Sequence, residues 1–138
     1  MAVPKIWRKI PQYYNLIGKS CQKCSEKYFP PRDICPECGA YPLVDFKFSG
    51  KGKIETFTII RSPLSDPEGE NLEIYFQKTP YVLAIIKLIE GPKITAEIVD
   101  CEMDEVKIEK AVNVVFRKIM EKGKHGVIQY GYKFRLVE

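Results

Sequence analysis

The spacing of four of its five cysteines constrains this chain more than any other feature. They form two Cys-x-x-Cys pairs, and the ten residues between the pairs are rich in proline and charge. Each pair can present two thiolates to one ion from a tight turn, and two pairs complete a tetrahedral set of sulfur ligands. Such a segment cannot order itself by burying apolar surface alone. The pattern therefore predicts one metal ion bound by Cys21, Cys24, Cys35 and Cys38.

Zinc is the expected ion because nothing in the sequence indicates electron transfer, although an iron site of the rubredoxin type also uses two such pairs. Two disulfides are the other alternative. The N-terminal residues lack the apolar core of a signal peptide, which predicts a cytoplasmic protein, where disulfides are rare. No apolar run approaches the roughly 18 residues of a membrane-spanning helix. A closed four-cysteine site has no open coordination position, so we expect one structural zinc ion per chain.

The remaining sequence predicts a mainly β fold that follows an N-terminal helical arm. Five runs of apolar and β-branched residues, separated by turn residues, suggest a five-stranded barrel. The OB fold is the economical choice, and another small barrel or an open sandwich is the alternative. One run is nearly all apolar, so we expect that strand to be buried on both faces. The expected strands are residues 54–61, 81–88, 94–99, 112–119 and 127–136.

Differences in composition and apolar pattern divide the chain into an arm over residues 1–20, a cysteine module over 21–45 and a barrel over 46–138. In the arm, Pro11 suits the first turn of a helix and Gly18 suits the position just past its end. If the arm is helical throughout, one apolar stripe is formed by Trp7, Ile10, Tyr14 and Ile17.

Glycines and one long connection mark where the barrel bends. The connection over residues 62–80 is longer than most loops, so it is either functional or a simple hairpin tip. A second hairpin tip is expected at residues 123–126. The candidate bend or bulge points are Gly50, Gly52 and Gly131.

No set of residues indicates catalysis. The chain lacks a Ser-His-Asp set, a phosphate-binding glycine loop and the helical motif of zinc proteases. Cys101 could be a nucleophile, but the single histidine, His125, lies at an expected turn, so an inert, buried thiol is the better interpretation. The acidic run over residues 100–105 is interpreted as a solvated loop, with a partner-binding patch as the alternative.

Charge gives little support to nucleic-acid binding. The formal net charge is +4, and residues 1–45 hold seven basic and four acidic residues. Four thiolates with one zinc ion carry a charge of −2, which lowers the net charge of the folded chain to about +2.

Between the cysteine pairs, two prolines stiffen the chain and present Phe29 for core packing, with Arg32 as a candidate anion contact.

Five short motifs follow one another along the chain, and they are Pro30-Pro31-Arg32, Cys35-Pro36-Glu37-Cys38-Gly39, Ser49-Gly50-Lys51-Gly52, Pro80-Tyr81-Val82 and Glu90-Gly91-Pro92. In this order they resemble those of the zinc-ribbon/OB-fold family once called domain of unknown function thirty-five, also described as acyl-CoA-associated. The resemblance covers nearly the whole chain and is specific as a combination. Where family members often have a glycine-rich turn before the fourth strand, residues 107–110 contain no glycine.

The resemblance implies a rubredoxin-like zinc ribbon and an OB barrel in a non-catalytic scaffold subunit. Family members accompany thiolase-superfamily enzymes, and in archaea one kind bridges an acetoacetyl-CoA thiolase and an HMG-CoA synthase. On this basis we expect a coenzyme A contact at Arg32, Lys51 and Lys53, because phosphates need such donors. The stripe of Trp7, Ile10, Tyr14 and Ile17 would bind the partner enzyme. The alternative is a nucleic-acid-binding OB protein, for which Tyr130, Tyr132 and Phe134 offer the best stacking platform.

Overall fold

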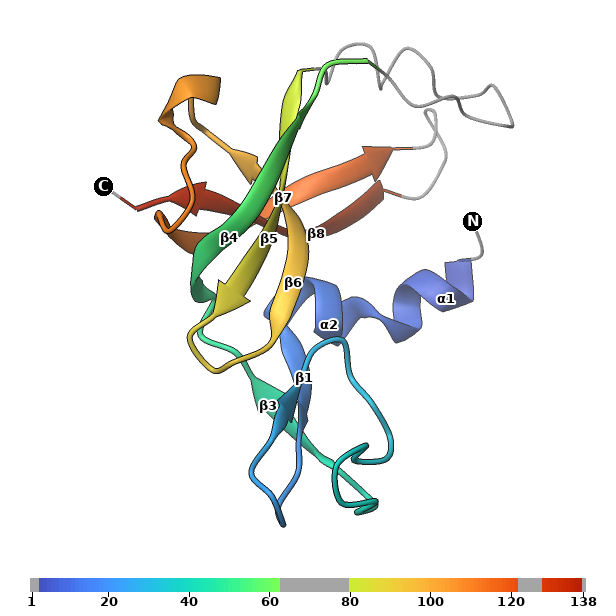
Figure 1. Ribbon diagram of the computed structural model, residues 1–138. Coiled ribbons are helices and arrows are strands. Elements are labelled where there is room, and N and C mark those ends of the chain that lie inside the picture. Colours follow the sequence, from blue (N-terminus) through green and yellow to red (C-terminus); the bar gives the residue numbers. More distant parts are fainter. Residues whose placement is uncertain (1–2, 63–79, 122–127, 138) are drawn as a thin grey trace.

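The computed structural model describes residues 3–62, 80–121 and 128–137, and its elements form an arm, a small sheet and a barrel (Figure 1). The arm holds helices α1 (Val3–Arg8) and α2 (Ile10–Asn15). The small sheet has the order β2-β1-β3 and is built from β1 (Ile17–Ser20), β2 (Lys27–Tyr28) and β3 (Val44–Lys47). Most of the 62–80 connection, the 123–126 tip and His125 lie outside the described residues.

The second sheet closes into a barrel with the order β4-β5-β6-β8-β7, which confirms the predicted five-stranded OB fold. Its pairs are antiparallel except β6 with β8, which is parallel. A short 3-10 helix, Met103–Glu105, precedes the fourth strand of the barrel, β7. The barrel strands are β4 (Lys51–Ile60), β5 (Tyr81–Leu88), β6 (Lys93–Val99), β7 (Ala111–Glu121) and β8 (Ile128–Leu136).

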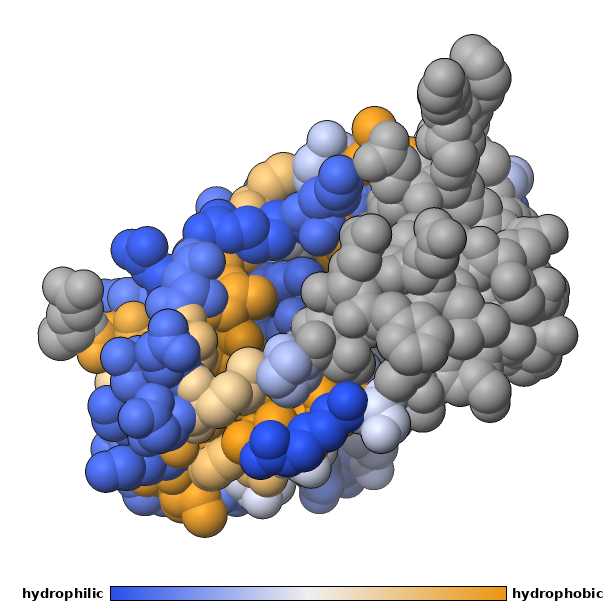
Figure 2. Space-filling view, turned by 90° about the horizontal axis from the view of Figure 1, so that it is seen from above, coloured by the Kyte–Doolittle hydropathy of each residue, from blue (hydrophilic) through white to orange (hydrophobic). Residues whose placement is uncertain are grey.

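Strand β5 was expected to be buried on both faces, and that prediction is wrong. Its side chains alternate, with Val82, Ala84, Ile86 and Leu88 buried inside the barrel. On the outer face Ile85 is 37% exposed. Successive side chains of a strand point to opposite faces, and a closed barrel has only one interior. Every second side chain of β5 therefore lies on the outer surface, even when it is apolar. When the molecule is seen from above, apolar side chains are visible between hydrophilic ones on the part of the surface that is not grey (Figure 2).

The glycines allow close packing, but the bulges lie elsewhere. Register shifts occur between Ile54 and Thr56 on β4 and between Lys118 and Met120 on β7. Gly50 has φ +81° and turns the chain into β4, as expected of a bend point. A Cβ atom at Gly50 would collide with the side chain of Val114.

The arm ends earlier than the sequence suggested. Pro11 lies in the first turn of α2, as predicted, but the helix ends at Asn15 and is followed by the cap residue Leu16, which has a left-handed φ of 53°. Gly18 belongs to β1, where the carbonyl of Tyr28 and the ring of Phe48 leave no space for a side chain. Because Ile17 is in β1, the expected stripe is not one continuous helical face. None of the described helices is long and apolar enough to cross a membrane.

Phe48 joins the small sheet to the barrel. It is buried, and its ring lies 5.8 Å from that of Phe29 and 4.9 Å from that of Phe46. The Phe48 amide donates to the carbonyl of Leu16 at 3.1 Å. Next along the chain, the Ser49 amide and hydroxyl donate to the two carboxylate oxygens of Glu90 at 2.9 and 3.2 Å. These contacts fix the linker between β3 and β4 against the barrel.

The close approach of Gly50 to β7 gives a stability prediction. We expect Gly50→Ala to lower the free energy of unfolding more than Gly91→Ala does, by about 1–3 kcal/mol, because the new methyl overpacks against Val114. Gly91 is the matched control: its φ is also positive, at +119°, but nothing lies within 4 Å of the place that a Cβ atom would take. Urea unfolding curves of the two variants measure the difference. Equal losses would contradict the described contact.

Candidate metal centre and binding surfaces

The four predicted cysteines come together in one cluster. Their Sγ atoms all lie within 4.8 Å of one another. The Cys21–Cys38 and Cys24–Cys35 sulfur pairs are each 3.5 Å apart, and the Cys38–Cys24 pair is 3.9 Å apart. Tetrahedral zinc with bonds of about 2.3 Å places its sulfurs roughly 3.8 Å apart. The donor set and its spacing therefore fit one zinc ion.

Both Cys-x-x-Cys turns use the same backbone hydrogen bonds. The carbonyl of Cys21 accepts from the Ser25 amide at 3.0 Å, and the carbonyl of Cys35 accepts from the Gly39 amide at 2.8 Å. The Cys21 amide donates to Glu26 and the Cys35 amide to Ala40 in equivalent positions. Ser25 and Gly39 both have positive φ, of 61° and 72°. Two matched turns thus present their sulfurs to a shared centre.

Tyr28 tunes one of the sulfurs, a role that sequence reasoning missed. Its hydroxyl lies 3.2 Å from Cys35 Sγ. The hydrogen bond from Tyr28, followed by backbone donors from the same turn, lowers the pKa of Cys35 to about 6 despite its burial. The same contact raises the pKa of Tyr28 above its ordinary value, so the hydroxyl stays a donor. The signal was available, because Tyr28 lies between the two cysteine pairs.

The cluster is suited to a structural role. Cys21 and Cys35 are buried together with Leu43, whereas Cys24 and Cys38 are exposed. Four thiolates fill the coordination sphere of zinc, so a bound ion would supply no activated water. The ion would instead hold the two turns together, and through the second of them the chain that leads to β3. The donor set and the closed geometry confirm the predicted structural zinc site.

The expected coenzyme A contacts do not form one described group. Arg32 is exposed on the ribbon, and Lys51 and Lys53 are exposed on the outer face of β4. The structure thus places Arg32 and the two lysines on different parts of the fold. Phe29, by contrast, is buried, and its ring lies 5.7 Å from that of Tyr132 on β8, which confirms its predicted core packing.

A cluster of aromatic rings lies where the arm meets β7 and β8. The ring of Tyr14 is 5.0 Å from that of Phe116, which stacks on Tyr130 at 5.4 Å. Phe116 lies in an apolar run of the sequence, within the strand expected over residues 112–119, but it is 49% exposed. The reason is that β4 pairs with β7 only through Lys51–Lys53 and the far half of the β7–β8 hairpin extends beyond the closed barrel. A side chain on the face of β7 that points into the barrel near its start therefore lies at the surface at Phe116.

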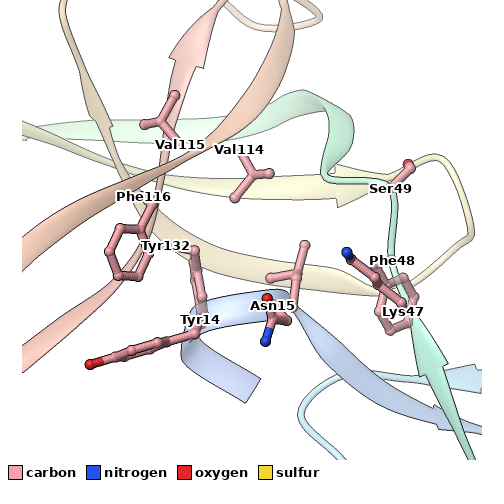
Figure 3. Close-up of a pocket in the computed structure, with 10 residues that line it drawn as sticks. Tyr14, Asn15, Lys47, Phe48, Ser49, Val114, Val115, Phe116 and Tyr132 are labelled. Atoms are coloured by element: carbon pink, nitrogen blue, oxygen red, sulfur yellow. The ribbon is translucent and has the colours of Figure 1, made fainter. Parts of the chain in front are cut away.

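A hollow of about 370 Å³ opens beside these rings, between the arm, the β3–β4 linker and β7 (Figure 3). Tyr14 and Phe116 border it on one side and Lys47 and Phe48 on the other. Val114 and Val115 line the β7 side, so its walls are mainly apolar. The hollow is large enough for one side chain or a small organic group from a partner.

The other predicted residues are distributed around this region. Trp7 on α1 is 65% exposed, and Ile10 is half-buried. On β8, Phe134 is fully buried and Tyr132 packs against Tyr13 at 6.0 Å. The proposed stacking platform is therefore largely used for packing within the chain.

Cys101 and the acidic run have structural roles in the described chain. Cys101 is half-buried against the core, and burial followed by the charge of Glu105 raises its pKa. A thiol of this kind is a poor nucleophile at neutral pH. Asp100 accepts from Arg117 at 2.8 Å, and Glu102 and Glu105 cap the 3-10 helix.

The Tyr28 contact predicts a change in zinc affinity. We expect Tyr28→Phe to bind zinc about tenfold more weakly, because a ligand thiolate loses its hydrogen bond while the ring is retained. Competition with a chromophoric chelator measures the affinity, and elemental analysis should give one zinc per wild-type chain. Tyr41→Phe is the control, since Tyr41 is an exposed tyrosine of the same ribbon. Equal affinities of the two variants would contradict the role of Tyr28.

Comparisons with known proteins agree with this architecture. Residues 8–41 match the family model described as the ChsH2 rubredoxin-like zinc ribbon domain, and residues 47–117 match the ChsH2 C-terminal OB-fold domain. The solved structure titled Ltp2-ChsH2(DUF35) aldolase superimposes with a TM-score of 0.68 at 22% identity, over 96% of this chain and 92% of that one. This likeness shows the fold.

Curated relatives show the family. A DUF35 domain-containing scaffold protein of Methanothermobacter thermautotrophicus is 44% identical over 95% of this chain and 93% of its own length. A protein of the same description from Methanocaldococcus jannaschii is 44% identical over 99% of this chain and 92% of its own. The chain therefore belongs to the family of DUF35 domain-containing scaffold proteins, with a zinc ribbon followed by an OB fold.

Proposed function

We propose that this chain is a non-catalytic subunit that binds a thiolase-superfamily enzyme and helps to shape an acyl-CoA site. The family is one of scaffold proteins, and a structure with the same fold is described as an aldolase that includes a DUF35 component. The arm, ribbon and barrel, predicted over residues 1–20, 21–45 and 46–138, would act together in a cytoplasmic complex. The finer proposal is that the partners are an acetoacetyl-CoA thiolase and an HMG-CoA synthase.

The observation that carries the proposal is the contact of two exposed rings, Tyr14 and Phe116, at 5.0 Å, with a third exposed ring, Trp7, on the same arm. Large aromatic side chains contribute much of the binding energy in protein interfaces, and a monomer exposes few of them in one region. The hollow beside Tyr14 and Phe116 provides a concave site for an anchoring side chain of the partner. The arm adds Lys5, Arg8 and Lys9 and no acidic residue, so an acidic rim on the partner would complement it.

The coenzyme A part of the proposal concerns the exposed cations. Arg32, Lys51 and Lys53 are exposed, so each could donate to a phosphate that a partner enzyme presents. In this proposal the partner supplies most of the coenzyme A site, because Arg32 lies on the ribbon and the two lysines lie on β4.

The interface predicts a loss of assembly in aromatic variants. We expect Trp7→Ala, Tyr14→Ala and Phe116→Ala each to weaken binding of the thiolase by about 30-fold, because each removes an exposed aromatic anchor. Co-expression with the thiolase from the same genome, followed by co-purification and calorimetry, measures this. Tyr41→Ala is the control, since Tyr41 is 75% exposed on the ribbon. If all four variants co-purify fully, the surface is not the interface.

A scaffold role also predicts an absence of turnover. We expect the purified chain with zinc to show no thiolase, synthase or hydrolase activity on acyl-CoA substrates, because the zinc site is closed and the Cys101 thiol is held protonated. Release of free thiol from acetyl-CoA and acetoacetyl-CoA is the assay. Turnover that disappears in Cys101→Ala would contradict the proposal.

A further inference from the structure

Three lysines form a row across the outer face of the barrel. The register places Lys53 of β4 directly opposite Lys87 of β5, and Lys87 directly opposite Lys93 of β6. All three side chains are exposed, because Ile54, Ile86 and Ile94, next to them in sequence, point inward and are buried. Like charges directly opposite one another on adjacent strands destabilise a sheet. The row therefore concentrates positive charge where the fold does not require it.

Only one lysine of the row has an acidic partner in the part of the chain that the structure describes. Lys93 forms an ion pair with Glu55 at 2.8 Å, and Glu55 lies at the register shift of β4. Lys53 and Lys87 take part in no ion pair or hydrogen bond among those residues. Two neighbouring ammonium groups are thus left uncompensated.

A hollow of about 460 Å³ lies against these two lysines. Lys53 and Lys87 line it together with Ile89, which follows β5 and is 67% exposed. Glu55 and Glu109 also line it, and Glu55 is already paired with Lys93. Glu109 has a left-handed φ of 71°, and its amide donates to the carbonyl of Ile54 at 2.8 Å. The backbone is thus fixed beside the hollow, and Glu109 is the one unpaired acid on its described wall.

We propose that this hollow binds the dianionic phosphate group of a small organic phosphate monoester, with Lys53 and Lys87 as donors and Ile89 against the organic part. Two ammonium groups match the double charge of one terminal phosphate above its second pKa of about 6. The exposed Ile89 side chain gives an organic group a contact that free phosphate cannot make. Glu109 limits the affinity, because its charge repels the ligand.

This inference goes beyond the scaffold role, since it assigns Lys87 and Ile89 and requires no partner enzyme. Phenyl phosphate is the probe, titrated into the purified zinc-loaded chain at pH 8 and low salt, with amide chemical shifts read by NMR. We expect Lys53→Gln and Lys87→Gln each to weaken binding about tenfold. Glu109→Gln should tighten binding. Lys19→Gln is the matched control, because it removes the same charge from the ribbon, where Lys19 is paired with Asp45.

The outcomes separate the sources of the phosphate. Weaker binding in both lysine variants, tighter binding in Glu109→Gln and no change in Lys19→Gln support the site. Inorganic phosphate that binds as tightly as phenyl phosphate would overturn the organic part. A single-stranded oligonucleotide that binds more tightly through the same lysines would overturn the proposal in favour of nucleic acid. Equal effects of the Lys53, Lys87 and Lys19 variants would overturn the site itself and leave the scaffold proposal untouched.

Discussion

The packing of Phe48 is the interaction on which the rest of this structure depends. Phe48 belongs to the linker between ribbon and barrel, yet it is buried in the same apolar cluster as the barrel residues Ile54, Val82 and Phe134. Phe29, from between the two cysteine pairs, meets it edge to face. An aromatic side chain buries about 150–250 Å² and prefers such offset contacts, so these rings join the ribbon to the barrel in addition to the covalent linker.

The metal and the aromatic core support each other. The zinc site holds the two cysteine turns, and the segment between those turns carries Phe29 into the core. Loss of zinc would release that segment and remove one wall of the aromatic cluster. The barrel would keep its own apolar interior, because the buried residues Ile86, Leu88 and Val112 lie on its own strands. Folding of the ribbon is therefore coupled to metal binding more strongly than folding of the barrel is.

The sequence predicted what depends on local pattern and missed what depends on where strands begin and end in space. Cysteine spacing identified the metal cluster, and runs of apolar and β-branched residues between turns identified all five barrel strands. Gly18 and Ile17 were misassigned because the helix ends at Asn15 and, after the cap residue Leu16, a strand begins at once, which no residue before Gly18 signals. The exposure of Phe116 could not be read from the apolar run in which it lies, because only the limited pairing of β4 with β7 shows that the hairpin leaves the barrel.

The short linker between β3 and β4 is held on three sides, by Leu16, Glu90 and Val114. A joint held in this way does not act as a hinge, so the ribbon and the barrel should tumble as one body. The chain then acts as a rigid spacer. The aromatic surface at the arm and the lysine row on the barrel are kept at a constant separation and angle, whatever is bound at either. A partner that engages one of them would find the other already in position, without the entropy cost of ordering a flexible connection.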